Sequence, residues 1–76
     1  MNVKHNQPVG FFERLQEVVI NSGLEITEIS KRTRLSRSSI YDYIYYGVTP
    51  NINALTKLCE VLHVSADYLL FGRKEV

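Results

Sequence analysis

The segment Leu24–Gly47 holds the residues with the clearest chemical potential in this chain of 76 residues. It is predicted to form two short helices joined by a tight turn, and the second helix opens with Ser36, Arg37, Ser38 and Ser39. An arginine in the first turn of a helix can pair with guanine in the major groove of DNA, while hydroxyls and helix-terminal amides hold phosphates. The pattern predicts a small protein that binds double-stranded DNA sequence-specifically.

Basic side chains gather in the same segment. The net charge is only +1, but four of the nine basic residues lie within seven positions and no acid lies among them: Lys31, Arg32, Arg34 and Arg37. A basic patch on a nearly neutral body is expected of a module that docks one face on DNA. An ordinary solvated helix surface has the same charge pattern, so charge alone leaves both interpretations open.

Composition and residue usage exclude several other classes of protein. With 45% hydrophobic and 22% charged residues, the chain is expected to form one globular domain. The single cysteine, Cys59, excludes an internal disulfide and a cysteine-only metal site and favours a reducing cytoplasm. No apolar run approaches the roughly 20 residues of a membrane span, and no secretory signal is evident. We expect no cofactor, metal or small-molecule ligand.

Catalytic constellations are also missing from the sequence. It offers no nucleophile with a matching base and no glycine loop that would cradle phosphates, so no enzymatic activity is predicted. His5 and His63 lie far apart and have no ligand partners at metal-site spacing.

Hydrophobic spacing predicts an all-α fold of five helices. We expect a flexible arm over 1–9, a domain over 10–72 and a tail over 73–76. The predicted helices cover about 12–21, 26–33, 36–46, 51–62 and 65–71. Their expected inward residues are Phe12, Leu15, Val18, Val19, Ile29, Ile40, Tyr43, Ile44, Ile52, Leu55, Leu58, Cys59 and Leu62.

Capping residues support these boundaries. Ser36, Asn51 and Ser65 are good N-caps, whereas Glu25 is a poor one. His63 is expected to take the left-handed position that ends the fourth helix, because His tolerates it better than most residues other than glycine.

Three segments together resemble the Cro/repressor-type helix-turn-helix family, also called the XRE family and typified by the phage lambda and 434 repressors. They are Gly23-Leu24 through Ile40, Pro50-Asn51 through Leu62, and His63 through Leu70. The resemblance implies a compact five-helix bundle of the lambda-repressor type. It also implies that the helix over 36–46 enters the major groove, with the amino ends of the second and fourth helices against phosphates.

The resemblance assigns contact roles residue by residue. The base-reading positions would be Arg37, Ser38, Tyr41 and Asp42, and the backbone contacts would be Thr27, Arg34, Ser36, Ser39, Tyr45, Tyr46, Thr49 and Asn51. Arg37 would prefer guanine. Asp42 would either accept from cytosine N4 or remain a surface carboxylate held off the DNA.

The chain departs from the family pattern at informative places. Ile26 stands where the family usually has a glutamine that braces phosphate, and Arg34 stands where the turn usually has glycine. Arg34 must therefore tolerate a positive φ, or the turn is rebuilt. Val19 and Ile44 occupy positions at which many relatives pair a buried arginine with a glutamate, so an ion pair is replaced by direct packing. The loop 48–49 lacks the usual lysines.

A tyrosine cluster leaves two functions open. Tyr43 is expected in the core, while Tyr41, Tyr45 and Tyr46 would contact DNA or a protein partner. The leading hypothesis is a repressor of the phage or mobile-element kind that binds a pseudo-palindromic operator as a homodimer. The alternative is an antirepressor-like interaction module that uses the tyrosine-rich face.

Surplus apolar surface is expected near the carboxy terminus. Phe11, Phe71 and Val76 would either contribute to a homodimer contact through the carboxy-terminal region or pack against the monomer's own core.

Overall fold

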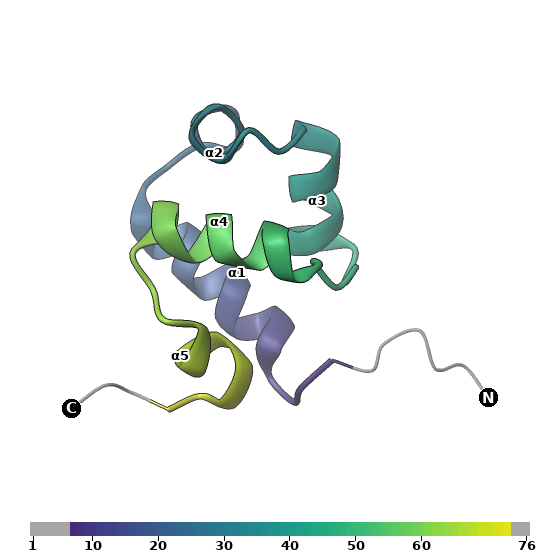
Figure 1. Cartoon of the computed structure of the whole chain (residues 1–76), viewed down its shortest axis with the longest axis vertical. Helices are drawn as coiled ribbons and strands as arrows, with labels where there is room; N and C mark the ends of the chain where they lie inside the picture. The colour runs from purple at the N-terminus through teal and green to yellow at the C-terminus, as the bar shows by residue number, and fades with distance from the viewer. Residues whose placement is uncertain (1–6, 74–76) are drawn as a thin grey trace.

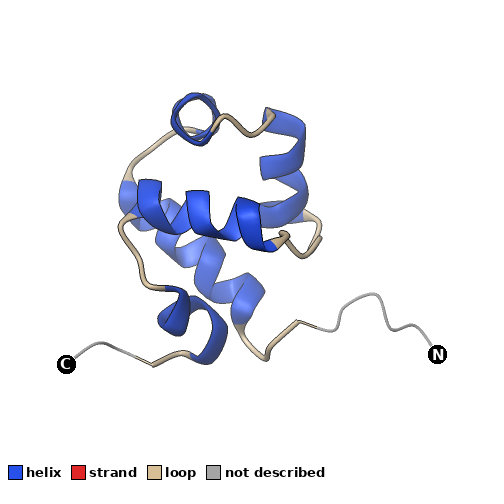
Figure 2. Cartoon of the chain, in the orientation of Figure 1, coloured by secondary structure: helices blue, strands red, loops and turns tan. Residues whose placement is uncertain are grey.

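The computed structural model describes residues 7–73, which form five helices and no strand (Figures 1 and 2). The helices are α1 (Phe11–Ser22), α2 (Ile26–Thr33), α3 (Arg37–Tyr45), α4 (Ile52–Leu62) and α5 (Ala66–Phe71). The all-α class and the five predicted helices are confirmed. Residues 1–6 of the expected arm, residues 74–76 of the expected tail and the proposed role of Val76 lie outside the described residues.

The helices enclose one hydrophobic core. α1 crosses the middle of the molecule behind α4, with α2 and α3 on one side of this pair and α5 on the other (Figure 1). The largest fully buried side chains come from all five helices: Leu15, Ile29, Ile40, Leu58 and Leu69. Each helix therefore depends on the others to cover its apolar face, as is usual for helices this short.

The buried line of α1 differs from the predicted one. Phe11, Leu15 and Val19 are buried at every fourth position, while Phe12 and Val18 are only partly covered. Because α1 begins at Phe11, this ring joins the core and is 2% exposed. Of the two expected roles, Phe11 therefore packs in the monomer's own core and does not add to a dimer contact, whereas Phe71 is exposed.

The inward face of α4 also needs one correction. Ile52 was expected in the core but is 82% exposed. Asn51 caps the helix with its side-chain oxygen, 2.8 Å from the Ala54 amide nitrogen, so Ile52 is the first helical residue. The buried face runs through Ala54, Leu58 and Leu62, and Ile52 lies about 200° around the helix from Ala54 at 100° per residue.

The predicted caps are confirmed. The hydroxyls of Ser36 and Ser65 accept from amides in the first turns of α3 and α5, each at 3.0 Å, and Glu25 makes no side-chain cap at α2. His63 ends α4 in the left-handed region with φ 57°. These local signals place the ends of each helix, and therefore the groups that the helix ends present to solvent.

Long polar side chains on α1 join distant parts of the chain. The Arg14 guanidinium donates from Nε and one terminal nitrogen to the Leu69 carbonyl, at 3.0 and 2.9 Å, and that same nitrogen donates to the Val9 carbonyl at 3.0 Å. Gly10 has φ 84°, and a Cβ there would collide with this guanidinium. Arg14 thus fastens α5 and the segment before α1 to one side chain.

Two glutamines fasten the carboxyl end of α3. Gln16 on α1 donates to the Ile44 carbonyl at 2.7 Å, and Gln7 donates to the Gly47 carbonyl at 2.9 Å. The last carbonyls of a helix have no partners within that helix, so the Gln16 amide satisfies a group that would otherwise need water. Gln16 holds the end of α3 against α1, and Gln7 holds Gly47, just after α3, against the segment that precedes α1.

Candidate nucleic-acid interface

The turn between α2 and α3 is held by hydroxyl side chains. The buried hydroxyl of Thr33 accepts from the Leu35 amide at 3.2 Å, and the Ser30 hydroxyl donates to the Leu35 carbonyl at 2.6 Å. Leu35 packs against the core. Between them, Arg34 adopts φ 64° and ψ 18°, so this residue accepts the left-handed conformation where relatives use glycine. The turn keeps its tight shape without being rebuilt.

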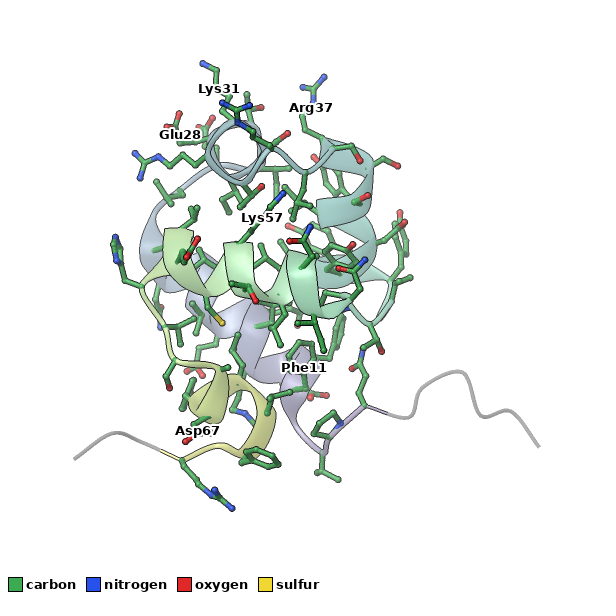
Figure 3. The ribbon with its side chains drawn as sticks, in the orientation of Figure 1. Phe11, Glu28, Lys31, Arg37, Lys57 and Asp67 are labelled. Atoms are coloured by element: carbon green, nitrogen blue, oxygen red, sulfur yellow. The ribbon has the colours of Figure 1, made fainter. Side chains whose placement is uncertain are left out.

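The first turn of α3 presents a cation to solvent. Ser36 caps the helix, and its hydroxyl also donates to the Ser39 hydroxyl at 3.0 Å, so the Ser36 hydroxyl both accepts and donates within the turn. Arg37 points outward from the beginning of α3 (Figure 3). Among residues 7–73, its guanidinium forms no hydrogen bond or ion pair. The charge is therefore free for an external acceptor.

A strip along α3 carries all four of the predicted base-reading residues. The helical period of 3.6 leaves a strip of α3 beside the buried Ile40 and Ile44. Its members are Arg37, Ser38, Tyr41, Asp42 and Tyr45. Asp42 is partly covered and the other four are exposed. The prediction that these side chains lie outside the core face of the helix agrees with their exposure, and their contact with DNA remains a prediction.

One residue of the basic cluster forms an ion pair within the protein. Arg32 forms an ion pair with Glu28, 2.8 Å from Nε to Oε2, one turn apart on α2. Lys31 has no ion-pair partner among the described residues and projects from the same end of the molecule as Arg37 (Figure 3). Arg34 is also exposed and unpaired within residues 7–73. Three cations thus surround the α2–α3 turn.

Comparison with known protein families identifies the α2–α3 arrangement. A helix-turn-helix family model matches residues 15–69, which is more than half of the chain and includes the α2–α3 turn and all of α3. The chain belongs to the Cro/repressor-type helix-turn-helix family. No curated protein and no solved structure matches it.

Family membership identifies this helix-turn-helix chain as a DNA-binding regulator in general terms. No helix within residues 7–73 is long and apolar enough to cross a membrane. The same residues contain no group of His, Cys, Asp and Glu side chains that could hold a metal ion.

The remaining predicted contact residues lie at helix ends and in loops. Thr27 and Thr49 are exposed, at the start of α2 and in the loop before α4. The side-chain oxygen of Asn51 is used in capping α4, which leaves its backbone amide and its side-chain NH₂ group for other contacts. Ile26 packs against the core, so only the uncapped amides of α2 remain there for an anion.

The tyrosines divide as expected between core and surface. Tyr43 is partly buried and packs against the core, whereas Tyr41, Tyr45 and Tyr46 are 44%, 55% and 71% exposed. The rings of Tyr41 and Tyr45 stack with centroids 5.6 Å apart. A shallow hollow beside the end of α3 is lined by Gln7, Phe12, Tyr45, Tyr46 and Gly47.

The hydrogen bonds from the Ser30 and Thr33 hydroxyls to Leu35 were not predicted from the sequence. Ser30 and Thr33 look like ordinary polar residues in a helix, and only the position of Leu35 shows why hydroxyls are useful there. A signal did exist, because Ser and Thr near a helix end often bond to the backbone of the following turn.

Proposed function

We propose that this protein is a sequence-specific transcriptional repressor that inserts α3 into the major groove of its operator. The observation that carries the proposal is Arg37, an exposed guanidinium at the head of the α3 strip that has no ion-pair partner within residues 7–73. It would bind a pseudo-palindromic site as a homodimer, with half-sites about 10–10.5 base pairs apart from centre to centre.

The position of Arg37 suits direct reading of guanine. Recognition helices contact base edges mainly with their amino-terminal residues, and arginine can donate two parallel hydrogen bonds to O6 and N7 of guanine. Such a pair discriminates against the wrong base by about 1–3 kcal/mol. No internal ion pair with the described residues has to be broken first, so little of this discrimination is lost on binding.

Phosphate contacts would come from the residues around the strip. Lys31 and Arg34 flank the α2–α3 turn, and the uncapped amino end of α2 presents backbone amides. Arg32 is partly neutralised by Glu28, and the loop before α4 has no lysine. Because few cations face the phosphates, binding should depend less steeply on salt than it does for a strongly basic repressor.

The test is selection of binding sites from random duplex DNA, followed by affinity measurements on the enriched sequence. We expect a palindromic consensus that contains guanine. Arg37→Ala should weaken binding to it by about 1–3 kcal/mol and relax the preference at that guanine. Arg73→Ala is the matched control, because Arg73 is also an exposed arginine but lies beyond α5, over the Phe71 ring.

A control affected as strongly as Arg37→Ala would show that bulk charge, rather than base reading, drives the binding. A selection without any enriched sequence would reject the proposed regulator.

A second candidate function is supported by the hollow beside α3. Its lining combines Phe12 with the exposed Tyr45 and Tyr46, and aromatic side chains of this kind are enriched at protein interfaces. The protein would then be an antirepressor-like module that binds a protein partner. If selection enriches no DNA sequence, and Tyr46→Ala removes a partner that the wild type holds, this second function replaces the first.

A further inference from the structure

The stacked pair of Tyr41 and Tyr45 is preorganised on the exposed strip of α3. The two residues are one helical turn apart, and their rings lie at 29° to each other with centroids separated by 5.6 Å. Both rings remain about half exposed. Neither hydroxyl forms a hydrogen bond with a described residue. The core does not need these rings, yet they restrict each other's rotation.

The chemistry of this pair suits an apolar group rather than a hydrogen-bonding one. A ring that is already held by a neighbour loses little conformational entropy when it makes a contact. In the major groove, the one apolar group that distinguishes base pairs is the methyl on C5 of thymine. Cytosine carries the same methyl when it is modified at C5. An aromatic face on a groove-facing helix is therefore matched to a C5-methyl pyrimidine.

We propose that Tyr41 reads a pyrimidine C5-methyl group in each half-site and that Tyr45 positions the Tyr41 ring by stacking on it. This inference rests on the proposed insertion of α3 into the major groove. Tyr41 is the contacting residue because it lies one turn after Arg37, whereas Tyr45 lies two turns after it, farther from the amino end that meets the bases.

Helix geometry places the methyl group near the guanine read by Arg37. The four residues from Arg37 to Tyr41 advance about 6 Å along the axis of α3. That distance corresponds to roughly two base-pair steps. The operator should therefore carry a thymine, or a methylated cytosine, within about two base pairs of that guanine. Burying one methyl should strengthen binding about fourfold per half-site.

The experiment measures affinity for the selected operator with its thymines replaced one at a time by deoxyuridine, which removes only the methyl group. A second arm compares cytosine with 5-methylcytosine at the same positions, which separates the two sources of the methyl. For the wild type, deoxyuridine at one position per half-site should weaken binding about fourfold for each methyl removed. Tyr41→Ala should bind the thymine and deoxyuridine operators equally.

Variants of Tyr45 test the positioning role. Tyr45→Phe keeps the stacked ring and should keep the wild-type ratio of thymine to deoxyuridine affinity, whereas Tyr45→Ala should reduce it. Ile20→Ala is the control, because Ile20 is an apolar residue that is 76% exposed and lies on α1, outside the α3 strip. Thermal melting of each variant shows whether it remains folded.

Two results would overturn the inference while leaving the regulator intact. One is a wild-type protein that binds its operator specifically but does not distinguish thymine from deoxyuridine at any position. The other is a folded Tyr41→Ala protein that keeps the full ratio. Absence of any specific operator would instead reject both this inference and the proposed function.

Discussion

Replacing Val19 by arginine, with Ile44 unchanged, tests how the core between α1 and α3 is built. Both residues belong to the buried cluster, at 8% and 3% exposure. α1 passes close to this end of α3, because Gln16 donates to the Ile44 carbonyl. An arginine at position 19 would bring a charge into this apolar site without the glutamate that many relatives supply.

The expected loss of stability follows from the burial. An uncompensated buried charge costs about 3–5 kcal/mol. At about 0.05–0.15 kcal/mol per residue, a chain of 76 residues has a total stability of roughly 4–11 kcal/mol. Val19→Arg should therefore lower the melting temperature by about 12 °C or more, since each kcal/mol shifts a domain of this size by about 4–8 °C.

The assay is urea and thermal unfolding followed by circular dichroism at the helical band. Ile20→Arg is the matched control, because the neighbouring Ile20 is 76% exposed and the same change there should alter stability by no more than about 0.5 kcal/mol. The double variant Val19→Arg, Ile44→Glu should recover about 0.5–3 kcal/mol through coupling of the two charges. A single variant as stable as the wild type would refute the assignment of these positions.

Three further changes have defined outcomes. Arg14→Met, which keeps an aliphatic stem but removes the bonds to the Leu69 carbonyl, should cost about 1–3 kcal/mol in unfolding free energy, and an unchanged urea midpoint would contradict it. Arg34→Gly should raise stability by up to about 1 kcal/mol because φ is positive there, while DNA binding weakens through loss of the charge; lower stability would disprove the strain. Burial, and secondarily the Glu60 carboxylate, raises the pKa of the Cys59 thiol, so alkylation at pH 8 should be slower in the folded protein than in urea. Equal alkylation rates in the folded and unfolded protein would refute the raised pKa. Because the pKa of this thiol is higher in the folded state, its contribution to stability is full below the unfolded pKa and is lost as the pH rises through the folded pKa.

Local signals in the sequence predicted the helix ends well. Ser36, Asn51 and Ser65 act as N-caps as expected, and His63 takes the left-handed position. These features depend on a few neighbouring residues, so a single sequence contains the information. The strip on α3 was predictable for the same reason, because the helical period alone places its residues together.

The prediction of burial failed at the first residue of two helices. Phe11 was placed outside α1 and Ile52 inside the core, and both assignments are reversed in the structure. At the first helical residue there is no preceding turn to fix the period, so the inward face is poorly determined there. A shift of one residue moves a side chain by about 100° around the helix, which is enough to exchange core and surface.

Hydrogen bonds between segments far apart in the chain could not be predicted from the sequence. The bonds from Arg14 to Leu69 and from Gln7 to Gly47 join residues 55 and 40 positions apart. Arginine and glutamine are common on helix surfaces, and neither residue type specifies which carbonyl it will meet. Only the packing of α1 against α5 and α3, which also sets where the neighbouring loops lie, brings these groups together.

The Arg14 clamp has a consequence for the way the folded chain opens. α5 has only six residues and would not be stable as a separate helix, and its last turn is held through the Leu69 carbonyl. The same guanidinium holds the Val9 carbonyl just before α1. Displacement of the Arg14 side chain therefore breaks both contacts at once, and the two segments should open as a single cooperative unit. In amide hydrogen exchange, the α5 amides and the first amides of α1 should show one shared opening free energy, distinct from that of the α2–α3 pair.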